Sequence, residues 1–193
     1  MKTQQMFRKF RHARMLEDDC FVADYTEYSN SRAGVVLAEE PFRDIEAFQL
    51  KQGRHRVRYV AVNLEQHPAF IRGIENCECF FASATPCERP WMLFLELKYC
   101  KARNIGSHTT KAISQMASVL RKLIEEEVID AEDYRIYFNY ASPANRRRQP
   151  FTHFVQTPAS SLDLIEQYNA YFLGFNQLII ASPQFIRSPK MRL

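Results

Sequence analysis

The pattern of apolar and polar positions divides the chain into short strands and a few helices. Runs rich in β-branched and aromatic residues, several of them alternating apolar with polar positions, are typical of strands. They cover residues 54–64, 74–83, 91–100, 134–142 and 177–182. Apolar side chains at a spacing of 3.6 residues predict a helix from Ser107 or Thr109 to about Glu127. Further helical patterns cover an N-terminal basic segment and residues 44–52 and 160–175.

This order of elements predicts an α/β fold with a single mixed β-sheet flanked by helices. The core has the order α-β-β-β-α-β from about residue 44 to 142, and a C-terminal helix and strand are added to it. There is no internal repeat and no linker rich in Pro, Gly or Ser. The 193 residues, 46% of them hydrophobic, are enough to bury one core, so we expect one domain over residues 1–193.

The strand WMLFLELKYC (91–100) contains two charged residues in an otherwise apolar run. Glu96 and Lys98 are two positions apart and therefore share one face of the strand. Cys87 lies midway between Glu78 and Glu96. A symmetric turn around Cys87 would place the two glutamates opposite each other, with Cβ atoms about 4.5–5.5 Å apart. A shift of one residue in this register would turn Glu78 to the other face of the sheet.

Two carboxylates at that separation repel each other, and a positive charge is needed between them. Lys98 supplies one charge, and a divalent cation supplies two. Proteins commonly hold Mg²⁺ with two carboxylates, water and a substrate phosphate. We therefore expect Glu78 and Glu96 to bind Mg²⁺ or Mn²⁺, which would polarise a phosphoryl oxygen and activate a water. Lys98 would orient that water or offset the developing negative charge.

These residues resemble a known superfamily. An acid on one strand (Glu78), a loop, and E-x-K on the next apolar strand (Glu96 and Lys98) are similar to the motif of the PD-(D/E)XK nuclease-like superfamily. The resemblance covers about half of the chain, residues 44–142. It implies that Glu78 and Glu96 bind the metal and that Lys98 serves the nucleophilic water.

Two more features belong to this resemblance. In KAISQ, Lys111, Ala112 and Gln115 match a K-A-x-x-Q pattern that the superfamily carries on the helix after E-x-K, which implies a catalytic role for Gln115. The superfamily often places another acid on its leading helix, and Glu46 is the candidate here. Its first acid is usually Asp, whereas this chain has Glu78, so a catalytically inactive member stays an alternative.

Basic clusters suggest contacts with nucleic-acid phosphates. The formal net charge is +4, which is compatible with a polyanionic partner without requiring one. The candidate nucleic-acid-binding residues are Arg54, Arg56, Arg58, Lys111, Arg146, Arg147 and Arg148.

The sequence therefore predicts a metal-dependent endonuclease or exonuclease that hydrolyses phosphodiester bonds in DNA, or alternatively in RNA. One rival is an inactive nuclease-like protein that binds nucleic acid or another partner. The other is an unrelated α/β domain in which E-x-K is incidental. A homodimer is also compatible with this interpretation.

The remaining expectations concern the cellular environment. No apolar run approaches the ~20 residues that a membrane helix needs, so we expect no membrane partner. The N-terminal segment has no apolar signal-peptide core, and five cysteines are an odd number. Both observations favour reduced thiols in a cytoplasmic protein.

Overall fold

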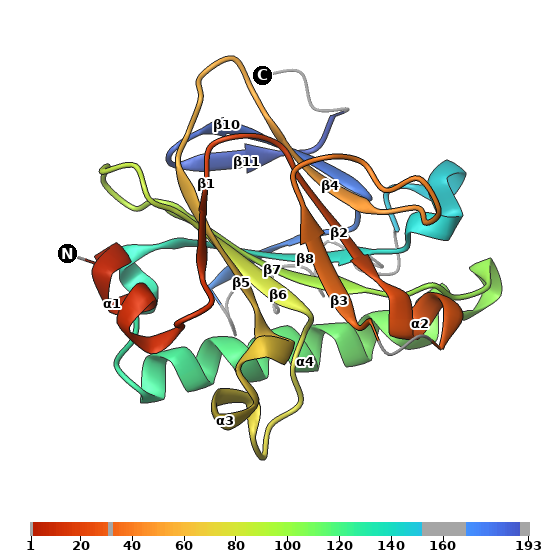
Figure 1. The fold of residues 1–193 in the computed structure, drawn as a ribbon, viewed down its shortest axis with the longest axis horizontal. Coiled ribbons are helices and arrows are strands. Elements are labelled where there is room, and N and C mark those ends of the chain that lie inside the picture. Colours follow the sequence, from red (N-terminus) through yellow and green to blue (C-terminus); the bar gives the residue numbers. More distant parts are fainter. Residues whose placement is uncertain (1, 31–32, 152–168, 190–193) are drawn as a thin grey trace.

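The computed structural model describes residues 2–30, 33–151 and 169–189, and within them eleven strands form two sheets (Figure 1). In spatial order, the six-stranded sheet consists of β1 (Arg14–Leu16), β5 (Tyr59–Asn63), β6 (Cys79–Ser83), β7 (Trp91–Leu97), β8 (Arg135–Ala141) and β9 (Ala170–Leu173). The five-stranded sheet consists of β11 (Phe185–Arg187), β10 (Gln177–Ser182), β4 (Phe48–Gln52), β2 (Cys20–Asp24) and β3 (Val35–Ala38).

The helices of the described residues are mostly short. The α-helices are α1 (Lys2–Lys9), α2 (Tyr25–Ser29), α3 (Pro68–Ile71) and α4 (Ile105–Glu125). Single 3₁₀ segments are η1 (Leu64–Gln66), η2 (Ala102–Asn104), η3 (Ala131–Asp133) and η4 (Pro143–Arg148). The long helix α4 buries one apolar face that includes Ala112, Met116 and Leu123, as the 3.6-residue spacing predicts.

The six-stranded sheet is the middle layer of the fold. One of its faces packs against α4, which runs along that side of the sheet, and against residues of α1 and α3 such as Met6 and Phe70 (Figure 1). Its other face packs against the five-stranded sheet, in a cluster that includes Tyr59, Phe48 and Leu178. The result is a layer of helices, a central sheet and a second sheet.

β7 is buried on both faces because it lies inside this middle layer. Its odd-numbered side chains pack between the two sheets: Trp91, Leu93, Leu95 and Leu97. On the other face, Met92 and Phe94 pack toward the helices, and Glu96 continues that face. The sequence therefore places a carboxylate on the helix-covered side of a fully buried strand.

The predicted α/β class, with a mixed sheet flanked by helices, is confirmed. β5, β6 and β7 pair antiparallel in chain order, α4 follows, and β8 pairs parallel to β7. The helix predicted to end near residue 127 is α4, and the strand predicted over 177–182 is β10.

Three details of the prediction are wrong. The chain builds two sheets instead of one, and β10 belongs to the second. The segment 44–52, predicted as the leading helix, contains β4 instead. There Phe48 and Leu50 are buried two positions apart, which is a strand period, and the apolar residue at Ile45 created the false helical spacing. Within 160–175, residues 170–173 form β9, and residues 160–168 lie outside the described part.

Two buried asparagine side chains attach the C-terminal segment to the end of β8. The Asn139 side chain donates to the Phe175 carbonyl at 2.9 Å and accepts from the Phe175 N–H at 3.1 Å. The Asn176 side chain accepts from the Ser142 N–H at 2.8 Å and donates to the Ser142 carbonyl at 2.9 Å. Each side-chain amide thus forms the two backbone hydrogen bonds that a neighbouring strand would otherwise form. Together they hold the chain where it passes from β9 in one sheet to β10 in the other.

The position of β7 predicts a large effect of truncating its core side chains. Phe94 is fully buried and its ring contacts Phe80 and Phe138. We expect Phe94→Ala to lower the free energy of unfolding by about 3–5 kcal/mol in urea denaturation. Phe185→Ala is the control, because that ring is 41% exposed, and it should cost no more than about 1 kcal/mol. Similar losses in both variants would contradict the layered core.

Candidate functional site

The register of the β6–β7 pair brings Glu78 and Glu96 together. Cys79 pairs with Leu95, and the same register continued by one residue pairs Glu78 with Glu96. Both side chains are buried, Glu96 completely. The predicted register around Cys87 is therefore confirmed. One Glu78 oxygen, Oε2, also accepts a hydrogen bond of 3.2 Å from the Leu97 N–H, which holds the carboxyl group over the end of β7.

Lys98 lies at the centre of three carboxyl groups. Its Nζ atom is 3.0 Å from Glu96 Oε1, 3.0 Å from Glu27 Oε1 and 3.7 Å from Glu78 Oε1. The Lys98 side chain is only 12% exposed. A single ammonium group thus faces three acids in a largely desolvated place, and the cluster carries an excess of negative charge when all four groups are ionised.

Glu27 is the member of this cluster that the sequence prediction missed. It lies on α2, which follows β2 directly and begins at Asp24. The Asp24 side chain caps the helix by accepting from the Thr26 N–H at 2.8 Å and the Glu27 N–H at 3.2 Å. The D-x-x-E spacing at residues 24–27 after an apolar run is a helix-start signal that could have located this helix.

The environment shifts the proton equilibrium of the two paired acids. Burial raises the pKa of Glu78 well above its ordinary value of 4.5, and repulsion from Glu96 adds to the effect, while Lys98 opposes it. Burial also raises the pKa of Glu96, against the effects of Glu78 and Lys98. With both groups ionised, Glu96 Oε1 has only its ion pair with Lys98, and Glu96 Oε2 has no hydrogen-bond partner among the described residues. A proton kept by Glu78 supplies that bond.

Lys98 stays protonated in this site. Burial alone would lower the pKa of its ammonium group, but attraction to Glu78 and Glu96 outweighs burial and raises the pKa. An ammonium group that keeps its proton cannot act as a general base near neutral pH. It can orient a water or stabilise an anion.

Gln115 and Lys111, the two polar residues of the KAISQ pattern, lie on α4 near this site but play different parts. The Gln115 amide donates to the Asn76 carbonyl at 2.8 Å, just before Glu78 in the chain. Its own oxygen is buried without a hydrogen-bond partner among the described residues. Gln115 therefore positions the segment that leads to Glu78, while Lys111, one turn earlier, is exposed.

The predicted basic residues divide between the two ends of the sheet. Arg54, Arg56 and Arg58 are exposed before β5, at the end of the sheet remote from Glu78, because Tyr59 pairs with Ser83 and Asn63 with Cys79. The sequence placed them in a strand, whereas β5 begins only at Tyr59. The structure does not bring these arginines together with the acidic cluster.

Arg146 and Arg147, in contrast, lie at the same edge as Lys98. They belong to η4, which follows β8, and β8 runs parallel to β7. The Ser142 hydroxyl donates to the Lys98 carbonyl at 2.9 Å, and the Asn145 amide donates to the Cys100 carbonyl at 2.8 Å. The side chain of Arg148 lies outside the described part of the structure.

Glu46 does not join the carboxylates around Lys98. It precedes β4 and forms an ion pair with Arg146. Its backbone carbonyl accepts a 2.6 Å hydrogen bond from the Tyr99 hydroxyl. The superfamily resemblance assigned Glu46 to a leading helix, but the acid on a helix beside Lys98 is Glu27.

Contacts between α2 and the end of β7 occur in two adjacent pairs. Glu27 forms the ion pair with Lys98. The next residues, Tyr28 and Tyr99, have ring centroids 5.3 Å apart in an edge-to-face arrangement. This double contact holds the short helix α2 against the acidic cluster.

The side chains around Lys98 limit how a metal ion could be held. Within the described residues, no three His, Cys, Asp or Glu side chains form a group that could hold one. A metal would therefore have at most two protein ligands, Glu78 and Glu96, with water and substrate phosphate completing its shell. Glu96 Oε2 has no hydrogen-bond partner among the described residues, and Oε1 faces Lys98 alone. Carboxylate oxygens are hard donors of the kind that Mg²⁺ takes, so the residues fit such an ion.

All five cysteines are free thiols. Cys77 and Cys79 flank Glu78 and are fully buried, and burial raises the pKa of both thiols. They are neutral packing residues beside the acid, as expected for structural cysteines.

Comparison of the chain with protein-family models, curated proteins and solved structures found no match. Among the described residues, no helix has the length and apolar character that crossing a bilayer requires. The resemblance to the PD-(D/E)XK superfamily therefore rests on Glu78, Glu96, Lys98 and the KAISQ segment alone.

The raised pKa of Glu78 predicts a pH dependence of stability. Above pH 4.5 the Glu78 carboxyl group keeps its proton in the folded state, whereas it has lost it in the unfolded chain. The contribution of this group to stability is therefore complete below pH 4.5 and is lost as the pH rises through the raised pKa. Glu78→Gln has no proton to lose. We expect its stability relative to the wild type to increase between about pH 5 and about pH 8 in urea denaturation. Glu132→Gln, at an exposed position, should show no such trend, and a flat difference for Glu78→Gln would contradict the shift.

Proposed function

We propose that the protein is a metal-dependent nuclease that hydrolyses phosphodiester bonds in DNA, with RNA as the alternative substrate. The observation that supports this proposal is the pair of facing buried acids, Glu78 and Glu96, beside the ammonium group of Lys98. The residues and their order along the strands resemble the site of the PD-(D/E)XK superfamily.

Each side chain has a role in this proposal. Glu78 and Glu96 would hold Mg²⁺ or Mn²⁺, which would supply a Lewis acid at the phosphoryl oxygen and lower the pKa of a bound water. Lys98 remains protonated, so it orients the attacking water or offsets the charge that develops on the phosphate. Glu27 is a positioning residue, because its contact with Lys98 draws the ammonium group toward α2.

The arginines at the same edge would contact the substrate backbone. Arg147 is exposed on η4, and Lys111 is exposed on α4. Positive side chains at this edge would neutralise phosphates next to the scissile bond. The remote cluster of Arg54, Arg56 and Arg58 would contact nucleic acid only if the bound strand extended to the other end of the sheet. A homodimer stays a prediction.

An inactive nucleic-acid-binding or interaction module is the second candidate. The observation that favours it is the closed contact of Lys98 with Glu27, Glu78 and Glu96, which compensates much of the negative charge without a divalent ion. A cluster of this kind can also serve stability alone. The two candidates differ in their response to Mn²⁺ and in cleavage.

Cleavage assays test the proposal directly. Wild-type protein with Mg²⁺ or Mn²⁺ should cut plasmid DNA, single-stranded DNA or RNA. We expect Glu96→Gln and Lys98→Met each to lower the cleavage rate by at least about 100-fold. The first weakens metal binding, and the second removes the positive charge beside the reacting phosphate. Glu132→Gln serves as the matched surface control and should keep the wild-type rate.

Thermal unfolding with Mn²⁺ supplies a readout independent of cleavage. A saturating ion should raise the Tm of the wild type, since it binds the folded state, and should leave the Tm of Glu96→Gln unchanged. Wild-type protein that binds DNA but neither cuts it nor responds to Mn²⁺ would support the inactive module instead.

A further inference from the structure

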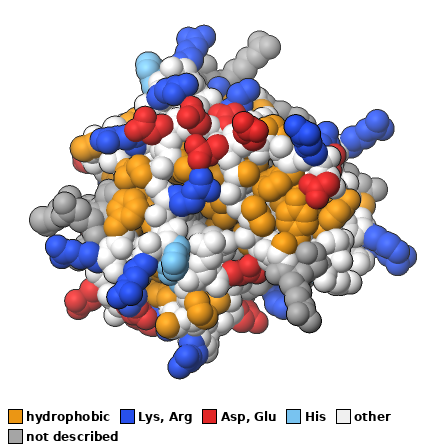
Figure 2. Space-filling view, viewed as in Figure 1, with side chains coloured by type: hydrophobic (Ala, Val, Ile, Leu, Met, Phe, Trp, Pro, Cys, Tyr) orange, Lys and Arg blue, Asp and Glu red, His pale blue; other side chains and the backbone are white. Residues whose placement is uncertain are grey.

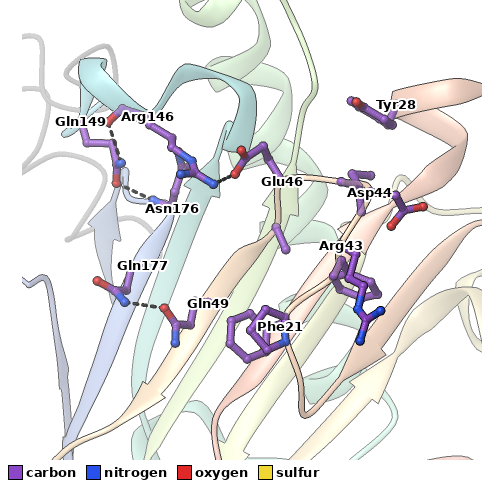
Figure 3. Close-up of a pocket in the computed structure, with 14 residues that line it drawn as sticks. Phe21, Tyr28, Arg43, Asp44, Glu46, Gln49, Arg146, Gln149, Asn176 and Gln177 are labelled. Carbon is purple, nitrogen blue, oxygen red and sulfur yellow. Dashed lines mark hydrogen bonds and ion pairs between the residues drawn. The ribbon is translucent and has the colours of Figure 1, made fainter.

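A cavity of about 550 Å³ lies beside the candidate site, between β2, α2, β4 and η4 (Figure 3). Ligand pockets in proteins have volumes of about 300–1,000 Å³. On the face viewed in Figure 2, hydrophobic side chains gather in the right half of the view, with both basic and acidic side chains around them. The cavity is not part of the Glu78–Glu96–Lys98 cluster.

Aromatic rings line one side of the cavity. They are Phe21 on β2 and Tyr28 on α2 (Figure 3), and Phe42 in the loop before β4 also lines the cavity. Tyr28 is 50% exposed, so part of its side chain is accessible to a ligand. Exposed aromatic rings at the mouth of a cavity are the surfaces on which unpaired nucleobases stack.

Side-chain amides line the opposite side (Figure 3). The Gln177 amide donates to Gln49, and Gln149 accepts from the Asn176 N–H at 2.7 Å. The side-chain amide oxygen of Gln177 makes no hydrogen bond within the described residues, since this amide is joined to Gln49 through its nitrogen, and it remains available to a ligand. Carboxamides pair with the donor and acceptor edges of bases.

The charges in the cavity balance each other. Arg146 forms an ion pair with Glu46, and Asp44 accepts a 2.8 Å hydrogen bond from the Tyr25 hydroxyl. Arg43 is the remaining cation among the lining residues. A balanced interior favours an uncharged ring over a phosphate group.

The cavity is joined to the acidic cluster by consecutive residues. Tyr28 follows Glu27, Tyr99 follows Lys98, and the two pairs touch as an ion pair and as a ring contact. The Tyr99 hydroxyl also reaches the carbonyl of Glu46, a lining residue. A nucleotide seated in the cavity would therefore have its neighbouring backbone close to the acids.

We propose that this cavity binds an unpaired nucleobase of a single-stranded nucleic acid, stacked on Tyr28 and hydrogen-bonded to Gln177. The inference rests on the proposed function, since it names the substrate that the same site would take. It makes the preferred substrate a single strand or an unpaired region.

Binding of a single strand of about 12 nucleotides with 2-aminopurine at one position tests this pocket, measured without divalent ions so that the strand is not cut. Fluorescence anisotropy reports affinity, and 2-aminopurine emission reports stacking. We expect Tyr28→Ala to weaken single-strand binding about 10-fold and to abolish the emission change. The matched control is Tyr171→Ala: Tyr171 is 48% exposed and its ring packs on Tyr137, as that of Tyr28 packs on Tyr99.

Gln177→Leu is the second variant and keeps the aromatic side intact. In this variant, the affinity for strands with a purine at the test position and the affinity for strands with a pyrimidine there should differ less than in the wild type. Equal single-strand affinity of Tyr28→Ala and wild type would overturn the pocket, even if both cut DNA. Binding with the emission change but without cleavage by any divalent ion would support the pocket and overturn the nuclease function. Absence of any binding to DNA or RNA strands would overturn the pocket.

Discussion

The antiparallel register of β6 and β7 is the constraint on which the candidate site depends. β7 lies between a layer of helices and a second sheet, so every side chain on it is buried on one face or the other. A strand in that position cannot shift by one residue without moving its whole apolar set to the wrong face. The same packing that fixes the core therefore also fixes Glu78 opposite Glu96.

Lys98 makes this arrangement tolerable. Two buried carboxyl groups side by side would be costly, and the ammonium group within 4 Å of both offsets part of that cost. Glu27 then draws the same ammonium group from a different element, α2. The cluster is thus assembled from three parts of the chain, and Lys98 is held between the acids of all three. Burial determines which of these acids keeps its proton.

The sequence was sufficient for the parts of the fold that depend on local periodicity. Helix α4 and the order β5, β6, β7, α4, β8 follow from spacing, and the symmetric placement of Glu78 and Glu96 about Cys87 gave the hairpin register. The sequence was insufficient for strands whose pairing partners lie far away in the chain. β4 joins β2 and β10, which lie far away in the chain, so its short strand pattern was mistaken for a helix. Glu27 and the cavity were missed for the same reason, because each requires the second sheet to be placed against the first.

The double contact between α2 and the end of β7 has a consequence for how the molecule would respond to a ligand. Glu27 and Tyr28 are neighbours on a helix of five residues, and their partners Lys98 and Tyr99 are also neighbours. A rotation of this short helix would disturb the ion pair and the ring contact together. Occupancy of the aromatic cavity and release of the lysine from its acidic partner would then be thermodynamically linked, each favouring or opposing the other to the same extent.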